Sequence, residues 1–474
     1  MTFRSTTAEA LGGDGYRITG DLTIKDVTRP PCRLPAARGG RSAFRKPRTP
    51  RRPCRPRTPR RPRTPRRPRT DRTTPAGGPP EAGTDNRAMR RTSRPGRRPA
   101  ADLSGRDRLP SLTGLRFWAA LVVVLYHLSR QVGQIPWVSD ATWYGRSGVT
   151  FFFVLSGFVL AWTYDGRRVP AKVFLWRRFA RIWPLLAATT ALSVAAYLAL
   201  GKEVTVKAVA ATLLLVNAWT PDPVILRGGN PAAWSLSDEA WFYLLFPLLL
   251  ALPAMRSARG RRRVAAVACV GVVLVWLAGA VITDPAVRAW ALGYLPVTRT
   301  LQFLLGVAAG LAVARGWRPP VSLGPAVALV VAWHLALIPW SHAAPDSLWY
   351  SPYQASQLLS TPFFALLVAA AAHADLQGRR TGLADRWSIR LGHWSFAWYL
   401  VHEIVIRVCV GVYGRPVGLL DTAQVWLLVI AASLALSAAA YHWIEHPLER
   451  LLRGTGPQPS GSGRHAPARS GTRS

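Results

Sequence analysis

The sequence predicts an all-α fold, a polytopic membrane bundle of about ten transmembrane helices with a re-entrant segment and a disordered basic N-terminal arm. Three observations predict it. Apolar stretches of spanning length recur from Leu112 to His446. Basic clusters fall between alternate stretches, as they do in loops retained on the cytoplasmic side. The segment before the first stretch is crowded with Arg and Pro and has no apolar periodicity.

These observations divide the chain into three parts. Residues 1–108 repeat the hexad RTPRRP and cannot bury a core, so we expect a disordered extension. It is either dispensable or an arm that binds anionic lipid headgroups or nucleic acid. Residues 109–450 form the transmembrane domain, and residues 451–474 form a disordered tail. The net charge of +38 would indicate nucleic acid in a soluble protein. In a membrane protein it first indicates cytoplasmic loops, so we expect no nucleic-acid partner.

The apolar stretches predict the individual membrane helices. These lie near residues 112–131, 147–165, 182–201, 234–253, 264–283, 298–315, 321–340, 355–374, 391–412 and 423–443. One further apolar stretch, 204–219, is predicted to dip into the bilayer and return. If it spanned, the cluster RSARGRRR would lie on the side opposite to every other basic cluster. Both termini are therefore expected on the cytoplasmic side.

The first helix carries two residues that a bilayer does not favour, Arg116 and His127. Eleven residues at 100° each place them on one helix face, separated by about 16 Å along the axis. This face therefore presents a fixed cation at one depth and an imidazole that titrates near neutral pH at another. The alternative interpretation makes Arg116 an interfacial anchor and His127 a packing residue.

The fourth predicted helix begins with WSLSDEAWFY. Ser235 and Asp238 have the spacing of a capping box, whereas Ser235, Glu239 and Tyr243 fall on one helix face. His127 lies about 22 Å from the cytoplasmic start of its helix, and Glu239 about 8 Å from the outer start of its own. In a hydrocarbon core about 30 Å thick, the two residues are therefore expected at the same depth. A carboxylate at that depth can orient the imidazole as a general base.

Four motifs occur in the order of a known family. They are Arg116 with His127 after ten residues, Arg178-x-x-Arg181, Trp234-Ser-Leu-Ser-x-Glu239 and Tyr399-Leu-x-His402. From Leu109 to Arg450 the chain resembles the acyltransferase-3 family, integral membrane enzymes that O-acylate carbohydrates and some secondary metabolites. The resemblance implies acyl-CoA as donor substrate, a hydroxyl-bearing carbohydrate or glycosylated molecule as acceptor, and no further cofactor.

The resemblance also assigns expected roles to individual residues. His127 is the catalytic base, oriented by Glu239, and Arg116 lies along the path of the donor. The donor phosphates are expected at Arg177, Arg178 and Arg181, because arginine binds phosphate in a bidentate manner. The expected substrate-binding residues are Ser156, Trp234, Ser237, Tyr243 and His402. His442, Glu445 and His446 are interpreted as a helix end before Pro447.

Two other sequence features bear on function. The four cysteines are far apart and in no metal-ligand spacing, so we predict no metal site. The Arg-, Ala- and Trp-rich composition is typical of a GC-rich bacterium, which predicts the bacterial plasma membrane. A transporter or flippase for a cell-envelope precursor is the alternative to an enzyme, since it too would bury His, Glu and Arg among about ten helices.

Overall fold

A computed structural model describes strands within residues 2–29 and then residues 109–167, 169–343 and 352–457. The chain forms two compact units, Met1–Arg94 and Pro95–Ser474. The RTPRRP repeats and residues 458–474 lie outside the described residues, so the predictions of disorder made for them stay predictions. Residues 451–455, assigned to the disordered tail, instead complete the last helix.

The first unit contains an antiparallel sheet in the order β1-β2-β3. Its strands are β1 (Thr2–Ala10), β2 (Tyr16–Ile24) and β3 (Val27–Arg29). The prediction of a disordered extension over residues 1–108 stays a prediction. The strands contain β-branched and aromatic residues, among them Phe3, Tyr16 and Ile18, and such residues favour extended structure.

The second unit is built from long helices, which confirms the all-α prediction for the membrane domain. They are α1 (Pro110–Gln131), α3 (Gly148–Tyr164), α4 (Ala171–Ala199), α7 (Trp234–Ala251), α9 (Ala258–Ala278), α11 (Pro296–Ala314), α12 (Leu323–Ala343), α14 (Thr361–Leu376), α15 (Arg386–Tyr413) and α16 (Leu419–Ala440). Each of these helices overlaps one predicted span.

Shorter elements connect them. The short helices are α2 (Val138–Thr142), α5 (Val206–Leu213), α6 (Pro223–Arg227), α8 (Pro253–Arg256), α10 (Pro285–Gly293), α13 (Pro352–Leu359) and α17 (His446–Thr455). The 3₁₀ turns are Gly145–Ser147, Asn217–Trp219, Gly279–Val281 and Gly382–Ala384, and Tyr441–Glu445 is a π-helical turn.

Helix lengths test the predicted spans. Nine helices of the described residues are long and apolar enough to cross a membrane. The predicted span at α7 is not among them, because the polar start WSLSDE lowers the mean hydropathy of this 18-residue helix. Helix α5 has eight residues and rises only about 12 Å. It is too short for a core about 30 Å thick, which confirms that the stretch 204–219 does not span.

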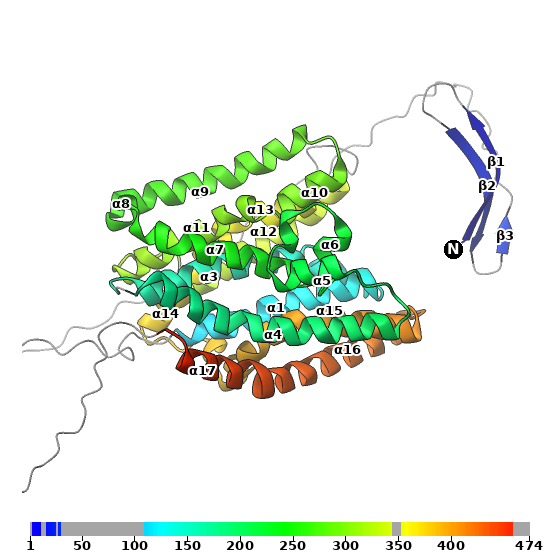
Figure 1. Ribbon diagram of the computed structural model, residues 1–474. Coiled ribbons are helices and arrows are strands. Elements are labelled where there is room, and N and C mark those ends of the chain that lie inside the picture. Colours follow the sequence, from blue (N-terminus) through cyan, green and yellow to red (C-terminus); the bar gives the residue numbers. More distant parts are fainter. Residues whose placement is uncertain are drawn as a thin grey trace, which may run out of the picture. The chain divides into compact units, whose positions relative to one another are not determined.

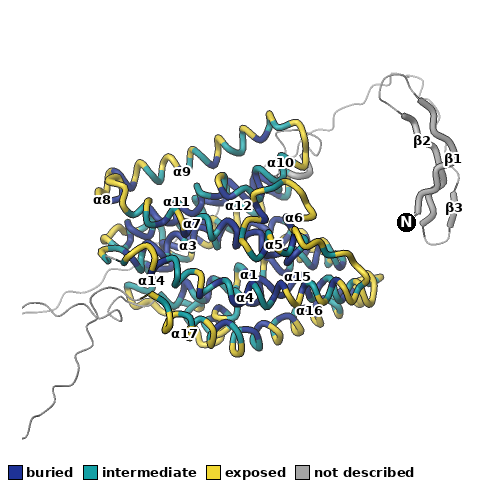
Figure 2. The backbone as a smooth tube through the Cα atoms, viewed as in Figure 1, coloured by how far each residue is buried: buried dark blue, intermediate teal, exposed yellow. Residues whose placement is uncertain are grey.

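The long helices lie side by side, in the order α9, α11, α3, α1, α15, α16 (Figure 1). Helices α4 and α7 pack on one face of this row, with α4 against α15 and α7 against α11. Buried residues concentrate in the middle of the row, whereas α9 and α16 expose many side chains (Figure 2). Those exposed side chains include Val267, Leu274, Leu427 and Leu428, which suits a surface that faces lipid.

The close packing of α3 against α11 depends on small residues. A Cβ atom added at Gly157 would lie 2.2 Å from the Phe303 carbonyl oxygen, and one at Gly306 would lie 2.1 Å from that of Val154. Gly157 and Gly306 therefore allow the close packing of α3 against α11. Such small-residue contacts let two backbones approach in a bilayer, where no hydrophobic effect drives helices together.

Replacing Gly157 by Ala should therefore force α3 and α11 apart. We expect a loss of stability of about 1–3 kcal/mol, the usual cost of overpacking. The thermal unfolding midpoint of the purified protein in detergent measures it. Gly324→Ala is the matched control, because Gly324 lies in α12 with nothing near its Cβ position. Equal midpoints for the two variants would contradict the role of Gly157.

Candidate active site

Helix α1 places Arg116 and His127 in two different cavities. Arg116 lies in the second turn and His127 about one turn before the C-terminal end. Helix α15 follows α1 closely, since a Cβ atom at Gly392 would lie 2.0 Å from the Thr113 carbonyl oxygen. The rings of Phe117 and Trp398 also stack across this interface, with centroids 5.8 Å apart. Residues of α15 are thereby brought against the face of α1 that carries both functional side chains.

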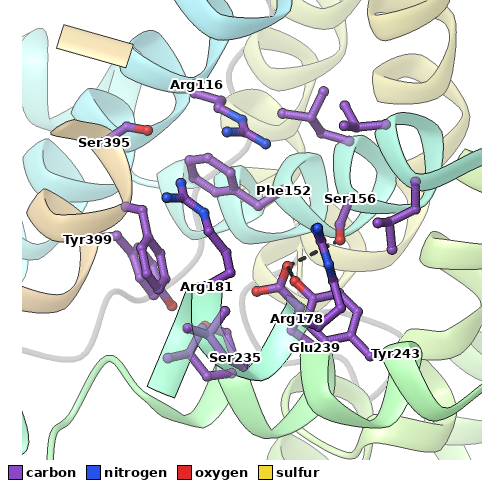
Figure 3. A pocket seen from close by; sticks show the side chains of 16 residues that line it. Arg116, Phe152, Ser156, Arg178, Arg181, Ser235, Glu239, Tyr243, Ser395 and Tyr399 are labelled. Carbon is purple, nitrogen blue, oxygen red and sulfur yellow. Dashed lines mark hydrogen bonds between the residues drawn. The ribbon is translucent and has the colours of Figure 1, made fainter. Parts of the chain in front are cut away.

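The first cavity, which we call the arginine cavity, has a volume of about 130 Å³. Its polar lining residues are Arg116, Ser156, Arg178, Arg181, Ser235, Glu239, Tyr243, Ser395 and Tyr399. They come from α1, α3, α4, α7 and α15 and converge on one space (Figure 3). Glu239 accepts hydrogen bonds from the Ser156 hydroxyl, at 3.1 Å, and from the Tyr243 hydroxyl.

The three arginines of this cavity differ in how their charge is balanced. Arg181 donates hydrogen bonds to Glu445 and, at 2.9 Å, to Glu449. Arg116 and Arg178 make no hydrogen bond or ion pair with any residue that the structure describes, although the Arg178 guanidinium lies 5.9 Å from the Tyr243 ring centre. Guanidinium groups that make no ion pair with a carboxylate, beside a cavity, favour an anionic ligand.

The second cavity, which we call the histidine cavity, has a volume of about 380 Å³. His127 and His402 line it together with Glu403, Gln131 and Arg407. His127 Nδ1 lies 2.8 Å from Glu403 Oε1, and the two histidine rings are 5.1 Å apart. Glu403 also accepts hydrogen bonds from Gln131, at 3.1 Å, and from Arg407, at 3.2 Å.

This arrangement suits an imidazole that accepts a proton. When Nδ1–H donates to a carboxylate, the tautomer is fixed and Nε2 keeps the free lone pair. Glu403 is 5% exposed, so its charge is held in a medium of low dielectric constant by His127 and Arg407. The His127 side chain is 22% exposed and therefore accessible from the cavity.

The predicted pairing of His127 with Glu239 is wrong. The structure pairs the imidazole with Glu403 and places Glu239 in the arginine cavity. His127 and Glu239 were paired because their predicted depths in the membrane agree, but depth does not determine which helix packs against α1. Helix α15, and not α7, lies against α1.

The other residues predicted for the site divide between the two cavities. Ser156 and Tyr243 line the arginine cavity, whereas Trp234 and His402 line the histidine cavity. Tyr399 lines both, so the cavities adjoin at this side chain. Two predicted residues line neither.

The first of these is Ser237, which is 1% exposed, and its hydroxyl has no hydrogen-bond partner among the described residues. The second is Arg177, which lies on α4 one residue before Arg178 but outside the set that lines the arginine cavity.

The capping box expected at Ser235 and Asp238 is also absent. Helix α7 begins at Trp234, and its N-cap residue, Ala233, makes no side-chain cap. Asp238 is fully buried, and neither of its carboxylate oxygens has a hydrogen-bond partner in the described chain. The capping spacing fails here because the helix starts one residue before Ser235, which places Asp238 inside the bundle.

Sequence analysis missed two acidic residues of the site. Glu403 had a sequence signal, since it precedes Arg407 by four residues on one helix, the spacing of an ion pair inside a membrane. Glu445 was interpreted only as part of a helix end, but it also makes a buried ion pair. It is 1% exposed, lies in the π-helical turn and pairs with Arg181. No local pattern distinguishes it from an interfacial residue.

In the described chain, no three His, Cys, Asp or Glu side chains form a group that could hold a metal ion. The charged groups that converge on the two cavities are arginines, two histidines and single carboxylates. Such a set can bind anions and transfer protons.

Comparisons with known proteins agree with this chemistry. Residues 109–442 match the model of a family described as an acyltransferase domain. The chain is 36% identical over 381 residues to acyltransferase MdmB of Streptomyces mycarofaciens, covering 73% of this chain and 92% of that protein. It is 29% identical over 340 residues to exopolysaccharide production protein ExoZ of Rhizobium meliloti, covering 70% and 96%.

A shorter match is to O-acetyltransferase OatA of Staphylococcus aureus, 29% identical over 157 residues, which covers 30% of this chain and 24% of that protein. No solved structure matches the chain. The family match covers most of the chain and includes both cavities. This protein therefore belongs to the acyltransferase-3 family and is a multi-pass membrane acyltransferase.

Proposed function

We propose that the protein transfers an acyl group, with acetyl as the first expectation, from acyl-CoA to a hydroxyl of a carbohydrate or glycosylated acceptor. The observation that carries this proposal is the pair of adjoining cavities along one face of α1. The arginine cavity holds two arginines that make no ion pair with a carboxylate among the described residues. The histidine cavity holds an imidazole paired with a carboxylate. Membership of an acyltransferase family favours this enzyme over the transporter that the sequence left open.

The arginine cavity suits the donor. Coenzyme A carries a diphosphate and a further phosphate, and Arg116 and Arg178 are the guanidinium groups of this cavity without a carboxylate partner among the described residues. Arg181 is held by Glu445 and Glu449, so we assign it to positioning the cavity wall rather than to direct phosphate binding. This revises the expectation that Arg177, Arg178 and Arg181 bind the phosphates together.

The histidine cavity suits the acceptor. His127 Nε2 takes the proton of an acceptor hydroxyl, whose oxygen attacks the thioester carbonyl carbon. The carbon–sulfur bond then breaks, and the departing thiolate takes the proton from the imidazolium. In the other order of events, Nε2 attacks the thioester carbonyl carbon and the carbon–sulfur bond breaks, which releases the CoA thiolate. The acceptor oxygen then attacks the acyl carbon, the carbon–Nε2 bond breaks, and the freed Nε2 takes the acceptor proton and passes it to the thiolate. Glu403 orients the ring and stabilises the imidazolium in both orders.

The relatives support an oxygen acceptor, because OatA is named an O-acetyltransferase and ExoZ an exopolysaccharide production protein. We also propose a bacterial plasma membrane with both termini on the cytoplasmic side. The basic clusters of the sequence then lie together on that side, where donor acyl-CoA is available.

His127→Ala should abolish transfer while leaving the protein folded. The expected loss is at least about 100-fold, the usual contribution of a general base. Membranes that contain the protein would be given labelled acetyl-CoA, and label in an acceptor and free CoA would be measured. An unchanged thermal unfolding midpoint controls for folding. Turnover retained in a folded variant would remove His127 from the chemistry.

Glu403→Gln should lower kcat by about 100-fold or more, because an amide cannot fix the tautomer or stabilise the imidazolium. Glu203→Gln is the matched control, since Glu203 is exposed in the loop after α4.

Glu239→Gln distinguishes the pairing of His127 with Glu403, seen in the structure, from the pairing with Glu239 that the sequence predicted. It should raise the KM for acyl-CoA more than it lowers kcat, and the reverse pattern would restore Glu239 as the partner of His127.

Arg178→Gln should raise the KM for acyl-CoA by about tenfold, the usual effect of losing one hydrogen bond from a charged donor. Arg177→Gln is its control, because Arg177 precedes it on the same helix but does not line the arginine cavity. Initial rates against acyl-CoA concentration would be compared for both variants. Equal shifts in the two variants would indicate a general surface effect and contradict a donor site in this cavity.

A further inference from the structure

The charge of the histidine cavity exceeds what its own catalytic pair needs. Four arginines line it, Arg130, Arg146, Arg227 and Arg407, against one carboxylate, Glu403. A cavity that received a neutral sugar alone would have no need of this excess, because each guanidinium must be kept hydrated or paired. The arrangement of the four side chains shows which of them are available to a ligand.

Two of the four are already engaged. Arg407 donates to Glu403 at 3.2 Å. Arg146 is 8% exposed, donates to the Tyr353 hydroxyl at 3.1 Å, and has its guanidinium 4.1 Å from the Tyr294 ring centre. The buried Asp238 carboxylate is also close enough to interact electrostatically with Arg146. These two arginines therefore belong to the wall of the cavity.

Arg130 and Arg227 remain. Both are exposed, and neither makes an ion pair or hydrogen bond within the part of the chain that the structure describes. The Arg130 guanidinium lies 4.8 Å from the Trp143 ring centre and 5.8 Å from that of Tyr126. These rings limit its rotation without neutralising its charge. Arg130 is thus preorganised for an anion.

The position of Arg130 on α1 sets where a bound anion would lie relative to the His127 imidazole. Arg130 follows His127 by three residues on α1, so the two share a helix face and differ in height by about 4.5 Å. In addition, His402 Nε2 is fully buried at the cavity and has no hydrogen-bond partner among the described residues. Aromatic side chains, including Trp234, Tyr294 and Tyr353, line the same cavity and offer faces for a sugar ring.

We infer that the acceptor is a glycoside with an anionic group, a phosphate or a carboxylate, that Arg130 and Arg227 bind about one helical turn from the hydroxyl presented to His127. This inference rests on the proposed function, since it takes the histidine cavity to be the acceptor site. A phosphate and a carboxylate share one property, because a guanidinium group can bind either of them in a bidentate manner. A phosphorylated sugar would supply the phosphate, and a uronic acid would supply the carboxylate.

Binding of model sugars to the purified full-length protein tests the inference without a need for turnover. Methyl glucoside, glucuronate and glucose 1-phosphate would be titrated by calorimetry. The two anionic sugars should bind at least about fivefold more tightly than the neutral one, and the stronger of them identifies the source. Equal affinity for all three sugars would overturn the inference.

Variants locate the bound anion. Arg130→Gln and Arg227→Gln should each weaken binding of the anionic sugars about five- to tenfold, and Arg130→Lys should restore part of the loss. Arg415→Gln is the control, because Arg415 is exposed but does not line the histidine cavity. Affinity unchanged in both Gln variants, or lost only in Arg178→Gln, would place the anion elsewhere and overturn the inference.

Transfer assays separate this inference from the proposed function. If neutral and anionic glycosides are acylated with equal kcat/KM, the inference fails and the acyltransferase function stands. If anionic sugars bind through Arg130 and Arg227 but no glycoside receives labelled acetyl groups, the anion site stands and the proposed function fails.

Discussion

The contact between α1 and α15 is the constraint on which the rest of the site depends. A histidine and a glutamate inside a bilayer are each costly, and together they stabilise each other only at hydrogen-bond distance. The small side chain of Gly392 lets the two helices approach, and this approach brings Glu403 to 2.8 Å from His127. Because one face of α1 also carries Arg116, the same helix fixes the separation between the arginine cavity and the imidazole.

The presence or absence of a partner for the guanidinium group distinguishes structural arginines from those that are available to ligands. Arg181, Arg407 and Arg315 each lie beside a carboxylate, and the fully buried Arg299 donates to the carbonyl oxygens of Gly293 and Gln357. Arg181, Arg315 and Arg299 join separate segments of the chain, whereas Arg407 pairs with Glu403 within α15. Arg116 and Arg178 in one cavity, and Arg130 and Arg227 in the other, have no carboxylate partner in the described chain. The protein thus combines an ordered network of buried charge with two cavities whose arginines are available to an anionic ligand.

Sequence alone predicted the helices well, because spanning length and loop charge are local properties that the bilayer enforces. It also singled out Arg116, His127, Arg178 and Arg181, which line the two cavities. It failed where the answer depended on which helices touch. The partner of His127 was assigned by depth to Glu239, whereas the packing of α15 supplies Glu403. Glu445 was missed for a similar reason, since it lies buried at the end of a π-helical turn and pairs with Arg181 of another helix.

The central claim is that donor and acceptor approach His127 from two adjoining cavities. The most direct test is an experimental structure of the protein with a non-hydrolysable acyl-CoA analogue. The account predicts the diphosphate beside Arg116 and Arg178, with the acyl end near Tyr399 and directed toward His127. A donor that lies wholly in the histidine cavity, with its phosphates against Arg130 and Arg227, would contradict both the assignment of the cavities and the anionic acceptor.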